Sequence, residues 1–217
     1  LSFSADKGFL LNGKPVKLKG GCIHHDNGLL GAVAIDRAEE RKVELMKANG
    51  YNAVRCSHNQ VSEHFLDACD RLGMLVIHET FDQWQAAKRE QDYHQFFDEW
   101  SDRDLSASVR RDRNHPSVWL WEPILNETWY PADFAKNTRD IVDAEYPYPY
   151  CYSGSDSEAR GHENFPVYFA HPANMQDASK EIDPTKTYFT REWGDNVDDW
   201  SSHNSPSRVA RNWGEQP

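Results

Sequence analysis

The chain has 217 residues, enough for one sizeable hydrophobic core, so a single α/β domain is the natural expectation. Its formal net charge is -11 and its Lys and Arg residues are scattered, which argues against nucleic acid and against an anionic membrane as partners. No apolar run approaches the roughly 20 residues that a membrane-spanning helix needs. The 4 cysteines lie far apart without C-x-x-C spacing, which favours free thiols over a zinc site or a disulfide framework.

Residues 1–18 are predicted to form an opening hairpin. In FLLNGKPVKLKG, an apolar strand leads into the turn dipeptide Asn12-Gly13, and a return strand follows Pro15. Seven β-rich runs separated by helical segments are expected within residues 18–194, and residues 195–217 are expected to be a trailing loop.

The predicted helices fall between these runs, over about residues 36–49, 62–73, 97–109 and 132–144. Asp36 and Ser62 are each placed to cap a first turn, and Gly50 and Gly73 are typical of helix ends. Strands that alternate with helices imply right-handed crossovers and a parallel sheet.

Polar residues stand at the carboxyl end of almost every predicted strand, after an apolar run. They are His24-His25-Asp26, Arg55 and His58, His78-Glu79, Asn126-Glu127, Ser153–Ser155, Tyr168 and His171, and Arg191-Glu192. A barrel gathers all such ends into one ring, whereas a doubly wound sheet concentrates its chemistry at one crevice. The pattern therefore favours a (β/α)8 TIM barrel.

Such a barrel typically takes about 250 residues, and this chain ends in RNWGEQP soon after the seventh predicted strand. We therefore expect a TIM barrel truncated before its eighth strand, within a longer multidomain polypeptide.

Two glutamates at strand ends are candidates for acid–base and nucleophilic chemistry. Glu127 follows an apolar strand, and an apolar surround raises a carboxyl pKa, as a general acid requires. Glu192 follows Arg191, and Tyr168 could donate a hydrogen bond to it; both would keep it ionised, as a nucleophile requires. In a retaining glycosidase two such carboxyls stand roughly 5 to 5.5 Å apart. The same residues are equally compatible with ordinary solvated or Arg-paired acids, and Glu122 is an alternative for the acid.

Five segments together resemble the barrel of glycoside hydrolase family 2, which includes β-galactosidases, β-glucuronidases and β-mannosidases. They are FLLNGKPVKLKG, NAVRCSHN, FLDACDRLGMLVIHE, RDRNHPSVWLWEPILNE and TREWG, and their order and spacing match over nearly the whole chain. The resemblance implies that Glu127, in the Asn-Glu pair after NHPSV, is the acid/base. It implies that Glu192 is the nucleophile.

The resemblance also implies roles for neighbouring residues. Asn126 would hydrogen-bond the sugar 2-hydroxyl, a contact that strengthens in the transition state. Arg55 and His58, in the R-x-S-H motif, would lie on the cavity floor near the nucleophile and the sugar. His24 would bind the sugar, and Tyr168 would support the nucleophile.

Trp193 follows the predicted nucleophile and could present a flat apolar face to a sugar. The chain departs from the family pattern in two places. Residues 22–25 read CIHH where N-R-H-E is common, and residues 121–127 read WEPILNE where W-S-I-G-N-E is usual. Pro123 cannot donate a ladder hydrogen bond, so a bulge or bend is expected there.

The expected reaction is therefore hydrolysis of a terminal β-glycosidic bond in an oligo- or polysaccharide, with retention. β-Galactosidase is the first choice, because the R-x-S-H segment and His24 resemble that branch. A β-glucuronidase is less favoured, because it would be expected to carry an Asn-x-Lys motif that binds the sugar carboxylate, and the Asn-x-Lys sequence of this chain, Asn12-Gly13-Lys14, lies in the predicted hairpin turn. A β-mannosidase or a polysaccharide-specific relative are further alternatives. No organic cofactor is expected, a divalent or monovalent cation is left unassigned, and a homo-oligomer would form through domains outside this chain. The compartment is left open: periplasmic or secreted for a polysaccharide scavenger, otherwise cytoplasmic.

Two readings from other classes remain at this stage. A metal-dependent hydrolase would use His24, His25, His58, His78 and Glu79, but adjacent strand residues face opposite sides, which disfavours His24 and His25 acting together. A catalytically silent carbohydrate-binding fragment is the other, since a barrel without its eighth strand leaves a sheet edge exposed.

Overall fold

The centre of the molecule is a sheet of seven parallel strands. The computed structural model describes residues 1–4, 6–124, 130–131, 133–148, 152–156, 159–170 and 185–190. The strands are β4 (Gly20–Ile23), β5 (Ala53–Cys56), β6 (Leu75–Glu79), β7 (Val118–Ile124), β8 (Tyr152–Asp156), β9 (Val167–Ala170) and β10 (Thr187–Thr190), and they lie in chain order, each parallel to its neighbour. These are seven of the eight strands of a (β/α)8 barrel, so the predicted fold is confirmed.

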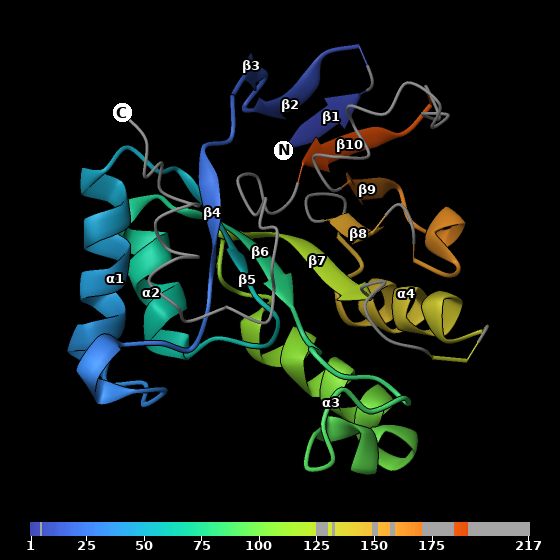
Figure 1. The fold of residues 1–217 in the computed structure, drawn as a ribbon. Helices are drawn as coiled ribbons and strands as arrows, with labels where there is room; N and C mark the ends of the chain where they lie inside the picture. The colour runs from blue at the N-terminus through green and yellow to red at the C-terminus, as the bar shows by residue number, and fades with distance from the viewer. Residues whose placement is uncertain are drawn as a thin grey trace, which may run out of the picture.

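Helices cover the outer face of this sheet, as Figure 1 shows. The α-helices are α1 (Asp36–Ala48), α2 (Glu63–Leu72), α3 (Phe97–Asp112) and α4 (Phe134–Glu145). Three short 3₁₀ helices are described in the connections: η1 (Gly28–Leu30), η2 (Tyr93–Gln95) and η3 (His162–Asn164). The four predicted helices are therefore present, with ends that differ by a few residues.

One of the two predicted helix caps is confirmed and the other is wrong. The Ser62 hydroxyl accepts a hydrogen bond from the Phe65 amide at 3.2 Å, and Gly73 ends α2 in the left-handed region at φ 71°. Asp36 is instead the first residue of α1; the capping position is Ile35, with no side-chain bond. In the first turn Asp36 still faces the positive end of the helix dipole.

A small antiparallel sheet lies at the amino ends of the parallel strands (Figure 1). It contains β1 (Ser2–Ser4), β2 (Gly8–Leu11) and β3 (Lys14–Pro15). The predicted hairpin is β2–β3, and its turn residues Asn12 and Gly13 both have positive φ, at 51° and 75°. The strand β1, which pairs with β2, was not predicted.

The sheet separates two apolar clusters. The outer cluster packs Val54, Cys56, Val76 and Trp121 against residues of the helices, such as Phe65 and Leu105. The inner cluster contains Phe9, Ile77, Trp119, Leu120, Val167 and Phe169. Phe9 comes from β2, and its ring lies 4.8 Å from that of Trp119 and 6.4 Å from that of Phe189. The opening hairpin therefore fills the amino end of the barrel interior.

Strand β7 is irregular at two points. Its register with β8 shifts between Trp121 and Ile124, which confirms the irregularity predicted at Pro123. Its register with β6 shifts as well, so that Val118 pairs with Val76 but Leu120 pairs with Ile77. Because of this shift against β6, the consecutive residues Trp119 and Leu120 both belong to the inner cluster.

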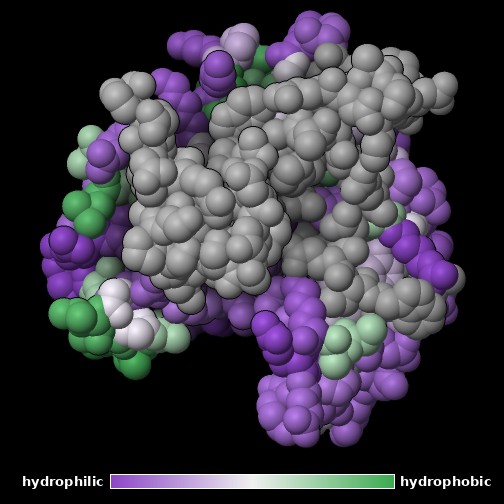
Figure 2. All heavy atoms as spheres, viewed as in Figure 1, coloured by the Kyte–Doolittle hydropathy of each residue, from purple (hydrophilic) through white to green (hydrophobic). Residues whose placement is uncertain are grey.

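Apolar side chains gather on the loop that precedes α1 (Figure 2). Leu29, Leu30, Val33 and Ile35 are all exposed there. The loop is held from inside by the Asn27 amide, which donates to the Val33 carbonyl at 3.0 Å and to Glu39 Oε1 at 2.7 Å. In the part of the chain that the structure describes, no helix is long and apolar enough to cross a membrane.

Candidate active site

Strand alternation places one basic and two acidic side chains inside the barrel. Arg55 on β5 pairs in register with Ile77 on β6, whose side chain belongs to the inner cluster. Glu79 lies two residues after Ile77 and therefore points inward too, and Glu122 pairs with it from β7. We call Arg55, Glu79 and Glu122, together with Cys22 on β4, the inner cage.

Arg55 is the hub of the inner cage. Its Nε contacts Glu79 Oε1 and donates a hydrogen bond to Glu122 Oε2 at 2.9 Å. Its Nη1 lies 3.7 Å from the Cys22 sulfur. The side chains of Arg55, Glu79 and Glu122 are 5%, 0% and 0% exposed, so the three ionisable groups meet almost out of contact with solvent. Such a buried arrangement holds only with close pairing, because each unpaired charge carries a large desolvation penalty.

Two histidines stand above the inner cage, at its solvent side. His58 Nδ1 lies 2.9 Å from Glu79 Oε2, so Glu79 is held by both Arg55 and His58. The His24 ring packs edge-on against that of His58 with the centroids 5.6 Å apart. His58 is 17% exposed, unlike the cage below it. The structure thus brings His24, Arg55 and His58 together, and their roles in sugar binding stay predictions.

The two carboxyls of the inner cage do not share their charge equally. Burial raises the pKa of Glu122 to about 8, with Glu79 and Asp156 adding to the rise and Arg55 opposing it. Burial would lower the pKa of Arg55, but the facing carboxyls keep it well above its ordinary value. At neutral pH the cage therefore contains one guanidinium, and Glu122 favours its protonated form.

His78 lies on the other face of β6 and belongs to a different group. Its Nε2 lies 2.7 Å from Asp112 Oδ2 at the end of α3, and both side chains are fully buried. Arg111 donates to both oxygens of Asp112, at 2.6 and 2.8 Å. The His25 Nε2 atom lies 3.0 Å from the Gln60 carbonyl oxygen. The five residues of the metal-hydrolase reading therefore do not converge on one point.

Among the described residues, three side chains with potential metal-ligand atoms within 4.8 Å of one another are Asp67, Asp70 and His115. Asp70 is already engaged, since it pairs with His115 at 2.7 Å and accepts from the Ser117 amide at 2.9 Å. Asp70 and His115 come just before the starts of β6 and β7, so this group lies at the opposite end of the strands from the inner cage.

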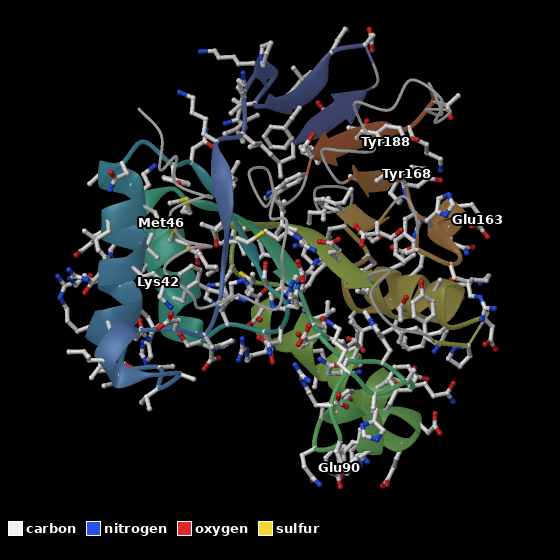
Figure 3. All side chains as sticks on the ribbon, in the orientation of Figure 1. Lys42, Met46, Glu90, Glu163, Tyr168 and Tyr188 are labelled. Atoms are coloured by element: carbon white, nitrogen blue, oxygen red, sulfur yellow. The ribbon has the colours of Figure 1, made fainter. Side chains whose placement is uncertain are left out.

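Tyr168 lies among aromatic side chains of β9 and β10. Its ring packs at right angles to Tyr188, 5.4 Å away, and against His162 at 5.0 Å, with the Lys186 ammonium 5.1 Å from its centroid. Figure 3 shows Tyr168 and Tyr188 close together. Its chain neighbours, Val167 and Phe169, point into the inner cluster, so alternation directs Tyr168 to the outer face. Its role beside the nucleophile stays a prediction.

The remaining predicted site residues lie outside the described residues. These are Asn126, Glu127, Glu192 and Trp193. The strands that lead to them are described: β7 ends at Ile124 and β10 ends at Thr190. Their roles therefore stay predictions.

A cavity of about 540 Å³ lies between the segment after β6 and helix α3. Its lining includes Asn59 and Thr80, which directly follow His58 and Glu79, and, from α3, Asp104 and Arg111. This volume is in the range that small-molecule sites occupy.

The sequence did not reveal that Glu79 and Glu122 hold Arg55. Glu79 was considered only as a strand-end acid or metal ligand, and Glu122 only as an alternative acid. A signal in the sequence could have revealed this contact. Side chains alternate between the two faces of a strand, and this alternation points Arg55, Glu79 and Glu122 into the barrel from three consecutive strands. Because the register of β7 shifts against both neighbouring strands, the direction of the Glu122 side chain cannot be worked out from alternation until the strand pairing is known.

Comparisons with known proteins agree with this fold. The profile of the glycosyl hydrolases family 2 TIM barrel domain matches residues 4–160. A relative named beta-galactosidase BoGH2A, from Bacteroides ovatus, is 39% identical over 188 residues, which are 85% of this chain and 22% of that protein.

Two solved structures are also similar. A glycosyl hydrolase family 2 member from Bacteroides cellulosilyticus is 42% identical with a TM-score of 0.77, over 87% of this chain and 26% of that one. A beta-glycosidase from Bacteroides vulgatus is 32% identical with a TM-score of 0.73, over 86% of this chain and 24% of that one. The chain thus spans about a quarter of the length of these relatives. It belongs to glycoside hydrolase family 2, and residues 4–160 belong to the TIM barrel domain of that family.

Proposed function

We propose that this chain carries the active site of a retaining β-glycosidase that hydrolyses a terminal β-glycosidic bond. In this proposal Glu192 attacks the anomeric carbon and forms a covalent glycosyl-enzyme. Glu127 protonates the leaving oxygen and then activates the water that releases the sugar. Asn126 hydrogen-bonds the sugar 2-hydroxyl, and Trp193 stacks on the sugar.

The observation that carries the proposal is the inner cage at the carboxyl ends of β5, β6 and β7. Glu127 follows the end of β7 by three residues, and Glu192 follows the end of β10 by two. Parallel strands of one barrel deliver their carboxyl ends to the same rim, which is where barrel enzymes have their active sites. Family membership supports the assignment of both glutamates.

The described residues also fit the electrostatic needs of this reaction. Arg55 is a cation held at the barrel interior, and a nearby cation favours the ionised form of a nucleophilic carboxyl. His24 and His58 stand at the solvent side of the cage, where they can donate or accept hydrogen bonds with sugar hydroxyls. The reaction requires no organic cofactor.

For the substrate, we propose a β-galactoside in an oligo- or polysaccharide. Two features support this choice: the R-x-S-H segment with His24, and the relative from Bacteroides ovatus that is named a beta-galactosidase.

Covalent labelling tests the proposal directly. An activated 2-deoxy-2-fluoro-β-galactoside should transfer one fluoro-sugar to the protein, detected as a single added mass and mapped by peptide sequencing to Glu192. Glu192→Gln should not be labelled, whereas Glu163→Gln, at an exposed position on η3, should be labelled like the wild type. Labelling of Glu192→Gln would show that the nucleophile is another residue.

Turnover of nitrophenyl glycosides separates this proposal from the silent carbohydrate-binding alternative. A silent fragment would bind sugar without releasing nitrophenol, and it would not show a burst with the fluoro-sugar. A panel of galactosides, glucuronides and mannosides would then rank the sugars.

A further inference from the structure

Glu122 has fewer partners than its burial leads one to expect. Its Oε2 atom accepts from Arg55 Nε at 2.9 Å, but its Oε1 atom is buried and has no hydrogen-bond partner. The residue is 1% exposed. An ionised carboxylate in such a place would leave half of its charge unpaired, which is strongly unfavourable.

Glu79 faces the same guanidinium in a different way. Each of its oxygens has a positive or potentially positive neighbour: Oε1 contacts Arg55, and Oε2 lies 2.9 Å from His58 Nδ1. Arg55 supplies a single positive charge to two carboxyls. The carboxyl with two partners is the one that this environment keeps ionised.

The charged and titratable groups around Glu122 and Arg55 come from four strands. Arg55 faces it from β5, Glu79 from β6 and Asp156 from β8, and Cys22 on β4 contacts Arg55 from the other side. His58 contacts the cage at Glu79. Because Glu79 and Asp156 are both acidic, ionisation of Glu122 would bring a third carboxylate next to a single guanidinium, and the like charges would repel one another.

We propose that Glu122 is a positioning residue that holds the Arg55 guanidinium from β7 as a protonated carboxylic acid, while Glu79 holds it from β6 as a carboxylate. The proposal rests on the proposed function, since it assigns Arg55 a place beside the nucleophile. In this proposal Glu122, five residues before Glu127 in the sequence, is not the acid/base.

This division gives Arg55 a fixed direction without adding a further negative charge near the two glutamates of the proposed function. The burial-driven rise in the pKa of Glu122 to about 8 agrees with the protonated form at neutral pH. Above that pH, Glu122 becomes a carboxylate and the field in the barrel interior changes.

Infrared difference spectroscopy tests the protonation state. At pH 7 the wild type should show the carbonyl stretch of a buried carboxylic acid that is missing in Glu122→Gln, and this band should disappear as the pH rises past about 8. Because Glu127 is also a candidate acid, the same band should persist in Glu127→Gln. Identical wild-type and Glu122→Gln spectra would overturn the proposal. If Glu122→Gln does not fold, loss of the band from Glu127→Gln at pH 7 would overturn it instead.

Kinetics on the galactoside test the positioning role. Glu122→Ala should lower kcat/KM by about 100-fold, mostly through kcat, because a misplacement of about 1 Å in a catalytic group has that effect. Glu122→Gln keeps an acceptor for Arg55 and should recover at least about tenfold of this loss. Its kcat/KM should also lack the inflection near pH 8 that Glu122 ionisation produces in the wild type. Glu39→Gln, a buried glutamate on α1 outside the cage, should match the wild type.

Equal activity of the Ala and Gln variants, or a wild-type pH profile in Glu122→Gln, would contradict the positioning role. These outcomes differ from failure of the proposed function. If the protein hydrolyses no glycoside and Glu192 takes no label, the proposed function fails while the infrared band can still be present.

Discussion

Two buried carboxyls on opposite faces of the same sheet have pKa values that are shifted in opposite directions. Asp112 lies on the outer side, at the end of α3, and Glu122 lies inside the barrel. Burial would raise the pKa of Asp112, but hydrogen bonds from His78 and Arg111 outweigh it and lower the pKa to about 2. Burial prevails for Glu122 and raises its pKa to about 8.

The difference lies in the partners and not in the depth of burial. Both side chains are 0% exposed, but Asp112 receives three hydrogen bonds from Arg111 and His78, whereas Glu122 shares one guanidinium with a second carboxyl. The outer carboxyl is therefore a structural anchor between β6 and α3. The inner carboxyl is a group whose charge can change within an ordinary pH range, which suits a catalytic interior.

The largest expected effect comes from breaking the outer group. Asp112→Asn removes the charge that His78 and Arg111 share, and loss of one partner from a buried ionic group lowers the free energy of unfolding by about 3 to 5 kcal/mol. Urea unfolding followed by tryptophan fluorescence at pH 7 measures this difference. A loss below about 1 kcal/mol would mean that this buried group stabilises the fold no more than an exposed ion pair does.

The matched control is Asp140→Asn, which breaks the exposed pair of Asp140 with Lys136 on α4. An exposed pair of this spacing contributes roughly 0.5 kcal/mol or less. The free energy of unfolding at acid pH gives a second check. Because the pKa of Asp112 is lower in the folded chain than its ordinary 3.8, its contribution is present above pH 3.8 and is lost as the pH falls towards 2. Asp112→Asn should not show this loss of stability between pH 3.8 and pH 2.

The inner carboxyl should show the opposite dependence on pH. The folded chain holds the Glu122 proton more tightly than the unfolded chain, so the group favours folding below pH 4.5 and this contribution is lost as the pH rises to about 8. Glu122→Gln cannot ionise. We therefore expect it to have a free energy of unfolding that exceeds that of the wild type by roughly 3 kcal/mol at pH 9, with a much smaller difference at pH 5.

Urea midpoints of the two proteins, measured from pH 5 to pH 9, give this comparison. Curves that stay parallel over the whole range would show that Glu122 has the same charge in the folded and unfolded chains. A variant less stable than the wild type at pH 9 would show that Glu122 is a stabilising carboxylate.

Local patterns were sufficient to predict the elements of this fold. The dipeptide Asn12-Gly13 predicted its hairpin turn because both positions need positive φ, and the Ser62 hydroxyl predicted a helix start. Pro123 predicted an irregular strand because it lacks an amide donor. Each of these signals depends on neighbours in the chain, so one sequence is enough to detect it.

The inner cage could not be predicted in the same way. Arg55 and Glu122 are 67 positions apart, and their contact depends on the register of three strands. Asp36 shows the same limit on a smaller scale: it has the residue type of a cap, but Ile35 occupies that position because the helix begins one residue earlier than a cap at Asp36 requires. For Glu127 and Glu192, the sequence supplied the residue types and the family resemblance supplied the roles.

The smallest effect on stability is expected from the histidine that faces the site. His58→Ala removes one of two partners of Glu79, but Arg55 remains in contact with that carboxyl and water can reach the vacated side, since His58 is 17% exposed. The free energy of unfolding should fall by about 1.5 kcal/mol, the usual value for a hydrogen bond to a charged group. His78 lies on the outer face of β6. His78→Ala should lower the free energy of unfolding by about 3 kcal/mol or more, because Asp112 then loses a partner in a fully buried place. Activity on the galactoside should reverse this order, with the larger fall in kcat/KM for His58→Ala, because His58 lies at the inner cage and His78 lies behind the sheet. Equal losses of activity after correction for the folded fraction would mean that the inner cage and the outer face of the sheet do not divide binding from stability.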